Sequence, residues 1–183
     1  IYSNVVLDAS QGPIIIAEGV QVYPFTYIQG PVFIGSKTNI KAGSIISEGT
    51  SVGEVCKVGG EIESSIIQAY SNKQHYGFLG HSYIGEWVNI GAGTTTSDLK
   101  NTYEPISVRI ENESFETQQT FLGLICGDHT KTAINTSFNS GTIAGLCCNI
   151  YHSGLLPKYI PSFTWGGDRS NSTIGSFERS IQT

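Results

Sequence analysis

The stretch from Ile16 to Ile62 decides the fold and reads IAEGVQVYPFTYIQGPVFIGSKTNIKAGSIISEGTSVGEVCKVGGEI. Counted from Ile16, every sixth residue is aliphatic, and the fourth residue after each of these is small or β-branched. The aliphatic set is Ile16, Val22, Ile28, Ile34, Ile40, Ile46, Val52 and Val58, and the second set is Val20, Thr26, Val32, Thr38, Ser44, Thr50, Cys56 and Ile62. A helix requires apolar residues about every 3.6 positions and an amphipathic strand about every 2. A period of six therefore predicts a short strand followed by a tight turn, with three such units in each coil of a triangular prism.

The same period returns in two later blocks, which one polar stretch separates. It resumes at Phe78, Ile84 and Ile90, and again at Leu122, Ile134 and Leu146. Residues 97–120, between the blocks, read SDLKNTYEPISVRIENESFETQQT. A coil cannot absorb so many polar residues, so we predict that they form a long loop outside the prism. Long excursions on a rigid scaffold are usually functional or disordered.

We therefore predict a single all-β domain over residues 1–183, built as a parallel β-helix. Its coils are expected over residues 14–96 and 121–156, with the excursion loop between them. Residues 157–183 lose the period and are expected to form a tail that packs on the outside or on a neighbouring protomer. The chain has no Met and begins with Ile1, so we expect it to be a fragment of a longer protein.

The composition narrows the class of protein further. The 22 glycines and a charged fraction of only 14% favour an all-β, turn-rich chain. The net charge of -5 argues against a nucleic-acid partner or an anionic membrane surface. No apolar run approaches the roughly 20 residues that a membrane-spanning helix needs, and no signal-peptide pattern opens the chain. The four cysteines lack the paired spacing of a zinc site, so free thiols in a cytoplasmic protein are the simplest interpretation.

Two segments resemble a known family, namely SSIIQAYSNKQHYGFLGHSYIGEWVNIGAGTTTSDLKN at residues 64–101 and LGLICGDHTKTAIN at residues 122–135. The family is the acetyltransferase domain of bifunctional N-acetylglucosamine-1-phosphate uridylyltransferase/glucosamine-1-phosphate N-acetyltransferases, including archaeal and Bacteroidetes-type sugar-1-phosphate nucleotidyltransferases. The resemblance extends from about Ile14 to Pro161. It implies a left-handed β-helix of hexapeptide repeats, a homotrimer, acetyl-CoA as co-substrate, and an N-terminal nucleotidyltransferase domain that this chain lacks.

The resemblance also implies a set of catalytic residues. In the family, the general base is a His three residues before an aromatic residue and five before a Gly, and His75 and Phe78 have this spacing. A histidine with an unperturbed pKa near 6.5 is suited to taking a proton from an attacking amine at neutral pH. Glu61 matches an acidic residue that positions the base, although Glu63 fits that role with a shifted gap. Asp98 stands where the family has an Asn beside the amine and the thioester, and it holds an ammonium, orients a nearby base or caps the loop.

Other positions are assigned to the sugar phosphate. Asn89 matches a substrate-contacting Asn, and Phe78 stands where many relatives have a Tyr that contacts the sugar phosphate. Loss of that hydroxyl leaves the identity of the amino sugar open. The lysine that many relatives place two residues after the acidic one is also absent. The candidate phosphate contacts are then Lys73, Lys100 and Arg109, which are alternatively solvated surface cations.

A third group is assigned to the cofactor. Ala92, Thr130 and Cys148 match positions that line the acetyl-CoA cleft between subunits of the family, and the alternative for each is plain core packing. Two other histidines have weaker assignments. His81 stands where the family usually has Asp and is expected on the surface or at an interface, and His129 lies in a motif near the cofactor site of archaeal relatives.

Three functions follow from these observations. The first is acetyl-CoA-dependent N-acetylation of an amino-sugar 1-phosphate, with glucosamine-1-phosphate as the first choice. The second is a non-catalytic β-helix that trimerises or regulates a fused sugar-1-phosphate nucleotidyltransferase. The third, a metal-dependent hydratase, requires three zinc ligands. His75 and His81 are one hexad apart and point from successive faces, so we expect no metal in this domain.

Overall fold

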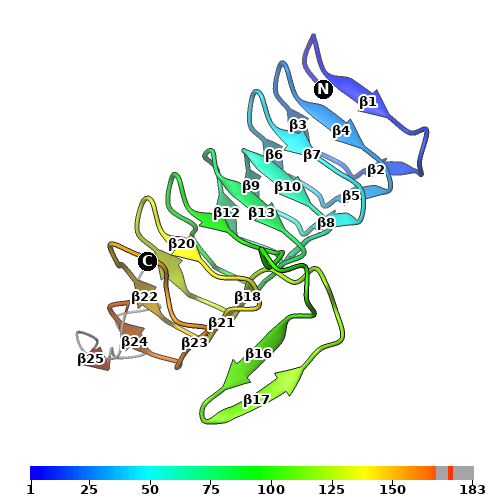
Figure 1. Ribbon diagram of the computed structural model, residues 1–183. Coiled ribbons are helices and arrows are strands. Elements are labelled where there is room, and N and C mark those ends of the chain that lie inside the picture. The colour runs from blue at the N-terminus through cyan, green and yellow to red at the C-terminus, as the bar shows by residue number, and fades with distance from the viewer. Residues whose placement is uncertain (168–172, 175–183) are drawn as a thin grey trace.

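The computed structural model describes residues 1–167 and 173–174, which wind into a parallel β-solenoid with three faces (Figure 1). The strands of the faces are only two or three residues long. None of the described residues is helical, so they contain no helix long and apolar enough to cross a membrane. The prediction of an all-β, parallel β-helix is confirmed.

Each face of the solenoid is a stack of strands, and we name the faces A, B and C. Face A contains β1 (Val6–Asp8), β4 (Tyr27–Gln29), β7 (Ile45–Ile46), β10 (Glu61–Glu63) and β13 (Phe78–Gly80), followed by β15 (Thr95–Thr96) and β20 (Ser137–Phe138). Face B contains β2 (Ile14–Ile16), β5 (Val32–Ile34), β8 (Thr50–Val52), β11 (Ile66–Ile67), β14 (Tyr83–Ile84), β18 (Ile125–Cys126), β21 (Ile143–Ala144) and β23 (Tyr159–Ile160). Face C contains β3 (Gln21–Val22), β6 (Asn39–Ile40), β9 (Lys57–Val58) and β12 (Asn72–Lys73), then, across a bridge at Asn89, β19 (Lys131–Thr132), β22 (Asn149–Ile150) and β24 (Thr164–Trp165), with β25 (Thr173–Ile174) antiparallel to β24.

The aliphatic period fills the interior of the prism. From Val22 to Val58, every residue of the predicted aliphatic set is fully buried. Small hydroxyl side chains at the corners are buried too, and they donate to turn carbonyls, as Thr38 does to Gly53 at 2.8 Å. Because each coil bonds only to its neighbours, the stability of such a fold is close to a sum of local contributions along the axis.

The predicted frame of the repeat holds at Ile84 and Ile90, which are buried, but it is wrong at Phe78 and in the last block, because the corners differ in length. Ile62 and Ile67 both point inward although they are five residues apart, so the frame shifts between them. The inward residue of β13 is therefore Leu79 rather than the predicted Phe78, and Ile134 is 68% exposed. The inward row of the last block is Cys126, Thr132, Phe138, Ala144 and Ile150.

Residues 97–120 leave the solenoid as predicted, and we call them the excursion. They are not only loop: β16 (Ser107–Ile110) pairs with β17 (Glu113–Glu116) in an antiparallel hairpin. β16 contacts β21 and β23, so the excursion folds back over the C-terminal part of face B (Figure 1). Lys158, on the coil beneath, donates its ammonium to the carbonyl of Ser107 at 2.9 Å.

The solenoid is longer than predicted at both ends. β1 pairs with β4, so the stack of strands begins before residue 14. β23 and β24 continue faces B and C, so residues 157–165 belong to a coil and not to a tail. The period is hidden there because the inward residues Leu156 and Ile160 are only four positions apart. Residues 168–172 and 175–183 of the predicted tail lie outside the described residues.

Candidate functional site

One corner between faces C and A is longer than the corner below it. In register, Val58 pairs with Lys73, and Glu61 pairs with Phe78. Two residues join Val58 to Glu61, whereas residues 74–77 join Lys73 to Phe78. The longer corner has residues without a counterpart in the coil below, so it bulges outward. We call residues 74–77 the bulge.

The bulge exposes His75 and Tyr76 to solvent. It is attached on both sides, because the Gly77 carbonyl accepts from the Glu61 amide at 3.3 Å and the Tyr76 carbonyl accepts from the Gly93 amide at 3.1 Å. Within the described part of the chain, no hydrogen bond engages the ring nitrogens of His75. The imidazole is therefore open to a substrate, and Glu61 is an exposed carboxylate on the adjoining coil.

Lys73 does not face a substrate, which corrects its assignment as a phosphate contact. It points inward, and only 3% of its surface is exposed. Its ammonium donates to three backbone carbonyls, those of Gly59 at 3.0 Å, His75 at 3.0 Å and Gly77 at 2.8 Å. A lysine has three N–H donors, so all of them are used inside the solenoid.

Because the Lys73 ammonium is buried, the free energy of unfolding changes with pH in the alkaline range. Burial lowers the pKa of Lys73 from 10.5 to about 8, so the unfolded state binds more protons than the folded state between these two values. We expect the free energy of unfolding of the wild type, relative to Lys73→Met, to rise by about 2–3 kcal/mol as the pH rises through this range. Urea unfolding of both proteins measures this difference, and ionisations common to both proteins cancel. A difference that stays constant or falls would contradict a buried, charged Lys73.

A second histidine lies at the opposite end of β13. His81 Nδ1 is 2.8 Å from Asp98 Oδ2, and the imidazole stacks on Phe121 with ring centroids 5.0 Å apart. Gly80 makes room for this pair, because a Cβ there would lie 2.3 Å from the Asp98 carboxylate. Asp98 was expected near the reacting amine or as a loop cap, and the structure pairs its carboxylate with His81. His81, expected as a plain surface or interface residue, is a half-buried member of a histidine–carboxylate pair.

We predict that His81→Ala loosens the root of the excursion. The Leu122 amide donates to the Asp98 carbonyl at 2.8 Å, and the Gly123 amide donates to the His81 carbonyl at 2.9 Å. Removing the imidazole leaves a carboxylate without its partner, which typically costs about 1–3 kcal/mol. Hydrogen exchange is expected to accelerate in residues 97–123 and to stay unchanged in the N-terminal coils. Unchanged exchange throughout would show that the pair does not hold the root.

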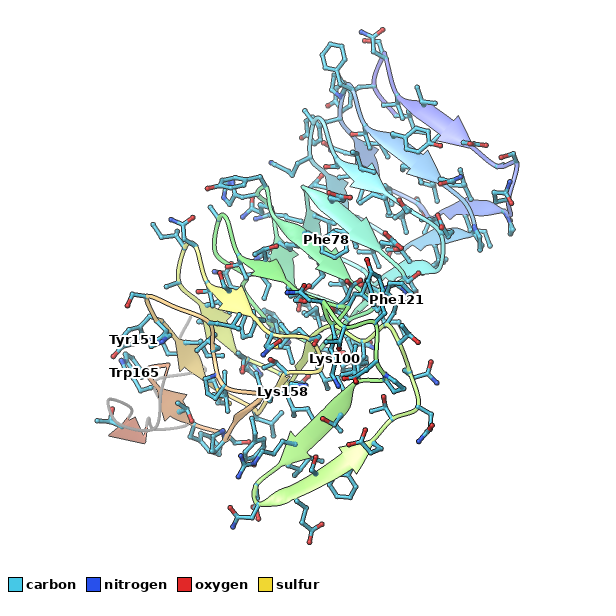
Figure 2. The ribbon with its side chains drawn as sticks, in the orientation of Figure 1. Phe78, Lys100, Phe121, Tyr151, Lys158 and Trp165 are labelled. Carbon is cyan, nitrogen blue, oxygen red and sulfur yellow. The ribbon has the colours of Figure 1, made fainter. Side chains whose placement is uncertain are left out.

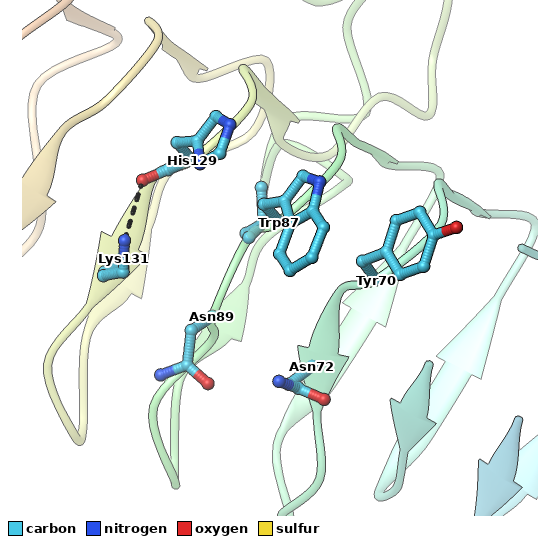
Figure 3. Close-up of a pocket in the computed structure, with 7 residues that line it drawn as sticks. Tyr70, Asn72, Trp87, Asn89, His129 and Lys131 are labelled. Atoms are coloured by element: carbon cyan, nitrogen blue, oxygen red, sulfur yellow. Dashed lines mark hydrogen bonds between the residues drawn. The ribbon is translucent and has the colours of Figure 1, made fainter. Parts of the chain in front are cut away.

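A groove of about 500 Å³ lies on face C (Figure 3). One side is a stack of rings from successive corners, with centroids 4.7 Å apart for Tyr70 and Trp87 and 6.2 Å apart for Trp87 and His129. Asn89, predicted to contact the substrate, is exposed and lines this groove. The full lining is Tyr70, Asn72, Trp87, Val88, Asn89, His129 and Lys131.

The sequence reasoning missed most of this groove, although a signal was available. Tyr70 and Trp87 are 17 residues apart, as are Asn72 and Asn89. This spacing is the length of the coil, so each pair stacks in register on successive coils. β12, which contributes Asn72 to the groove, leads directly into the bulge.

The other predicted cations lie in the excursion. The Lys100 ammonium donates to the Pro105 carbonyl at 2.6 Å, and Arg109 Nε donates to the Glu111 carbonyl at 3.0 Å. Figure 2 shows Lys100 where the excursion leaves the solenoid. No contact joins either cation to His75 within the described part of one chain. Their role as phosphate contacts stays a prediction.

Phe78 lies on the outward side of face A, partly exposed, as Figure 2 shows. Two lysines that were not singled out from the sequence, Lys57 and Lys41, lie on coils below the bulge. Lys57 is exposed and pairs in register with Asn72. A Cβ on Gly59 would lie 3.1 Å from the Cβ of Lys41, so Lys41 packs over the short corner below the bulge.

Two of the predicted cofactor residues are interior. Thr130 donates its hydroxyl to the Gly145 carbonyl at 2.7 Å and accepts from the Cys148 amide at 3.0 Å. Both Thr130 and Cys148 are buried, and burial raises the pKa of the Cys148 thiol. Their side chains pack the core, as the alternative interpretation had it, and a contribution of their backbone to a cleft between subunits stays a prediction. Ala92 is half-buried at the corner next to the bulge, and its carbonyl accepts from the Asn135 amide at 2.7 Å.

A three-faced parallel solenoid of six-residue repeats, with an exposed histidine on one corner, defines the class of hexapeptide-repeat acyltransferase folds. The crystal structure of UDP-N-acetylglucosamine O-acyltransferase (LpxA) from Moraxella catarrhalis matches with a TM-score of 0.51 at 17% identity, covering 91% of this chain and 64% of that chain. This likeness supports the fold alone. Among the described residues, no three His, Cys, Asp or Glu side chains are placed to share a metal ion.

Sequence relatives show which family the chain belongs to. The chain is 34% identical over 131 residues to the bifunctional protein GlmU of Methanocaldococcus jannaschii, covering 72% of this chain and 31% of the relative. It is 32% identical over 152 residues to the bifunctional sugar-1-phosphate nucleotidylyltransferase/acetyltransferase of Sulfurisphaera tokodaii, covering 82% of this chain and 38% of the relative. No protein-family model matches the chain. The chain is a homologue of the GlmU-type bifunctional proteins over its β-solenoid, and it spans about a third of their length.

Proposed function

We propose that this chain transfers an acetyl group from acetyl-CoA to the amine of an amino-sugar 1-phosphate, with His75 as the general base. Glucosamine-1-phosphate is the first choice of acceptor. The observation that carries the proposal is the bulge, which presents the His75 imidazole to solvent without a described hydrogen bond, while Glu61 on the adjoining coil is attached to the bulge through its backbone amide. The names of the sequence relatives, which include a nucleotidylyltransferase/acetyltransferase, support the same activity.

Acetyl transfer to an amine requires a general base and a thioester that is held in position next to the amine. The amine attacks the thioester carbonyl, and His75 takes the proton that the nitrogen loses as the C–N bond forms. Collapse of the tetrahedral intermediate breaks the C–S bond, and the CoA thiolate leaves and is protonated. Imidazole is the side chain that most often takes a proton in this kind of general base catalysis. No covalent acyl-enzyme is required.

The groove on face C is the proposed path to the base. It ends at β12, which leads into the bulge, and Asn72 and Asn89 offer amide donors and acceptors along it. Lys57 lies one coil below Asn72 and is the proposed phosphate contact from the same chain. Lys100 and Arg109 are proposed to serve a neighbouring protomer, because the excursion holds them apart from the bulge of their own chain.

We propose a homotrimer as the assembly. Face B carries a row of exposed, outward-facing apolar residues, which Ser51 interrupts between the second and the third: Ile15, Phe33, Ile66 and Tyr83. Exposed apolar patches commonly mark protein–protein contacts. Packing of this face against a second copy would cover the row.

The alternative is a non-catalytic solenoid that trimerises or regulates a fused nucleotidyltransferase. Specific observations favour it. Phe78 lacks the hydroxyl of its counterparts in many relatives, and Asp98 pairs with His81 rather than with His75. Glu63 also occupies the position two residues after Glu61, where many relatives have a lysine. A carboxylate there repels a phosphate.

A thiol-release assay separates the two functions. The chain is incubated with acetyl-CoA and with glucosamine-1-phosphate, galactosamine-1-phosphate or unphosphorylated glucosamine. Saturable release of CoA with a phosphorylated hexosamine, together with the N-acetylated product by mass spectrometry, supports catalysis and identifies the epimer. A rate with every acceptor that equals the rate of acetyl-CoA hydrolysis in buffer favours the non-catalytic alternative.

A further inference from the structure

One position in the inward row of face C breaks the repeat. In the described coils this row reads Val22, Ile40, Val58, Lys73, Ile90, Thr132 and Ile150. Its other members are aliphatic, apart from one threonine. An ammonium at such a position loses its hydration, whereas an aliphatic or thioether side chain of similar length would satisfy the packing. A charged residue that breaks the aliphatic row and does not improve the packing indicates a functional constraint at this position.

The acceptors of the ammonium indicate what the constraint is. Gly59 belongs to the short corner of the coil below, whereas His75 and Gly77 belong to the bulge. Lys73 therefore ties the longer corner to the shorter one at the place where their lengths differ. Without the ammonium, the carbonyls of Gly59 and His75 would have no donor among the described residues, and the Gly77 carbonyl would keep only the Glu61 amide at 3.3 Å. Buried carbonyls are rarely left without a donor.

We propose that Lys73 is a positioning residue that fixes the bulge and thereby the direction in which His75 is presented. The role in catalysis rests on the proposed function of His75 as the base. Lys73 acts through His75 and not on the substrate, because its side chain is buried and its donors are all engaged. One of those donors binds the carbonyl of His75 itself, so the tie acts directly on the residue that it positions.

The test compares Lys73→Met with Ile90→Met, a replacement at the same inward row one coil later. Hydrogen exchange of the bulge and steady-state acetyl transfer are measured on both. In Lys73→Met we expect exchange of residues 74–78 to accelerate at least about tenfold, because local opening no longer breaks three hydrogen bonds. We expect kcat to fall about 10–100-fold with KM within about twofold, as for a misplaced catalytic group. Ile90→Met is expected to stay within about twofold of the wild type in all three measurements.

A third variant keeps the proposal testable if Lys73→Met does not fold. Lys73→Gln is neutral and shorter but retains two N–H donors, so exchange and kcat are expected between those of the wild type and of Lys73→Met. If Lys73→Met folds and its bulge exchanges at the wild-type rate, the proposal is overturned. If Lys73→Met does not fold, a wild-type exchange rate of the bulge in Lys73→Gln overturns it. A loss of kcat that is equal in Ile90→Met also overturns it. If the wild type does not acetylate, the proposed function fails, while the exchange measurement still decides whether Lys73 holds the bulge.

Discussion

His75→Ala is expected to lower kcat for acetyl transfer by about 10²–10⁴-fold while the solenoid stays folded. The attacking amine must lose a proton as it bonds to the thioester carbon, and the variant has no base at the bulge to accept it. Stability should change by less than about 0.5 kcal/mol, because the exposed imidazole makes no described hydrogen bond. Thiol release with acetyl-CoA and the preferred hexosamine phosphate measures kcat, and thermal unfolding checks the fold.

Two companion variants make the result specific to one imidazole. Tyr76→Phe keeps the bulge and removes only a hydroxyl that lies 3.3 Å from Asn135 Oδ1, so kcat should stay within about threefold. His81→Ala removes the other imidazole of this region. If kcat falls in His81→Ala but not in His75→Ala, the base is His81, which Asp98 orients. A histidine oriented by a carboxylate is a recurrent catalytic arrangement. Full activity in both histidine variants would refute a histidine base in this domain.

Gly77→Ala is expected to destabilise the protein by about 2–4 kcal/mol, from backbone strain and from overpacking. Gly77 has a φ of 125°, a conformation that residues with a Cβ rarely adopt. A Cβ there would also lie 2.0 Å from the carbonyl oxygen of Thr94, a backbone atom held within the next coil. The bulge must therefore move, and kcat should fall along with the free energy of unfolding. Urea unfolding and the thiol-release assay measure the two effects.

Gly43→Ala is the matched control for that substitution. Gly43 also has a positive φ, 71°, but a Cβ at this position has no atom within 4 Å. We expect a loss of about 1–2 kcal/mol from the left-handed backbone alone and no change in kcat. Equal losses in the two variants would mean that the close approach of Thr94 contributes nothing.

The fold was largely predictable, because the narrow interior of the prism takes one aliphatic residue from each strand and this spacing is visible in the sequence. Ile28 and Ile40 are fully buried as their spacing required. The positions of the inward residues after Ile62 were not predictable from the period. Corners of different length can join the same short strands, and each change in corner length shifts the inward positions. The shift at Ile67 becomes evident only when the strands are paired. The hairpin of the excursion was missed for a related reason, since its stability depends on packing against face B.

The sequence motif singled out His75, and the structure places it in an exposed corner, while its role as the base stays a prediction. The inward position of Lys73 was not predictable, since a lysine in a polar stretch suggests a surface cation and its acceptors come from the corners of two coils. The His81–Asp98 pair was within reach. The two residues are 17 apart, which is the length of the coil at this height, and both depart from the family pattern together.

The unequal corners have a consequence for how such proteins diversify. A corner belongs to one coil, and the strands on either side keep their partners when it gains or loses residues. Insertions and deletions at these places are therefore tolerated by the rest of the chain, much as surface loops accept them in other folds. Divergence among such solenoids is expected to proceed through corner lengths at least as readily as through point substitutions on the faces.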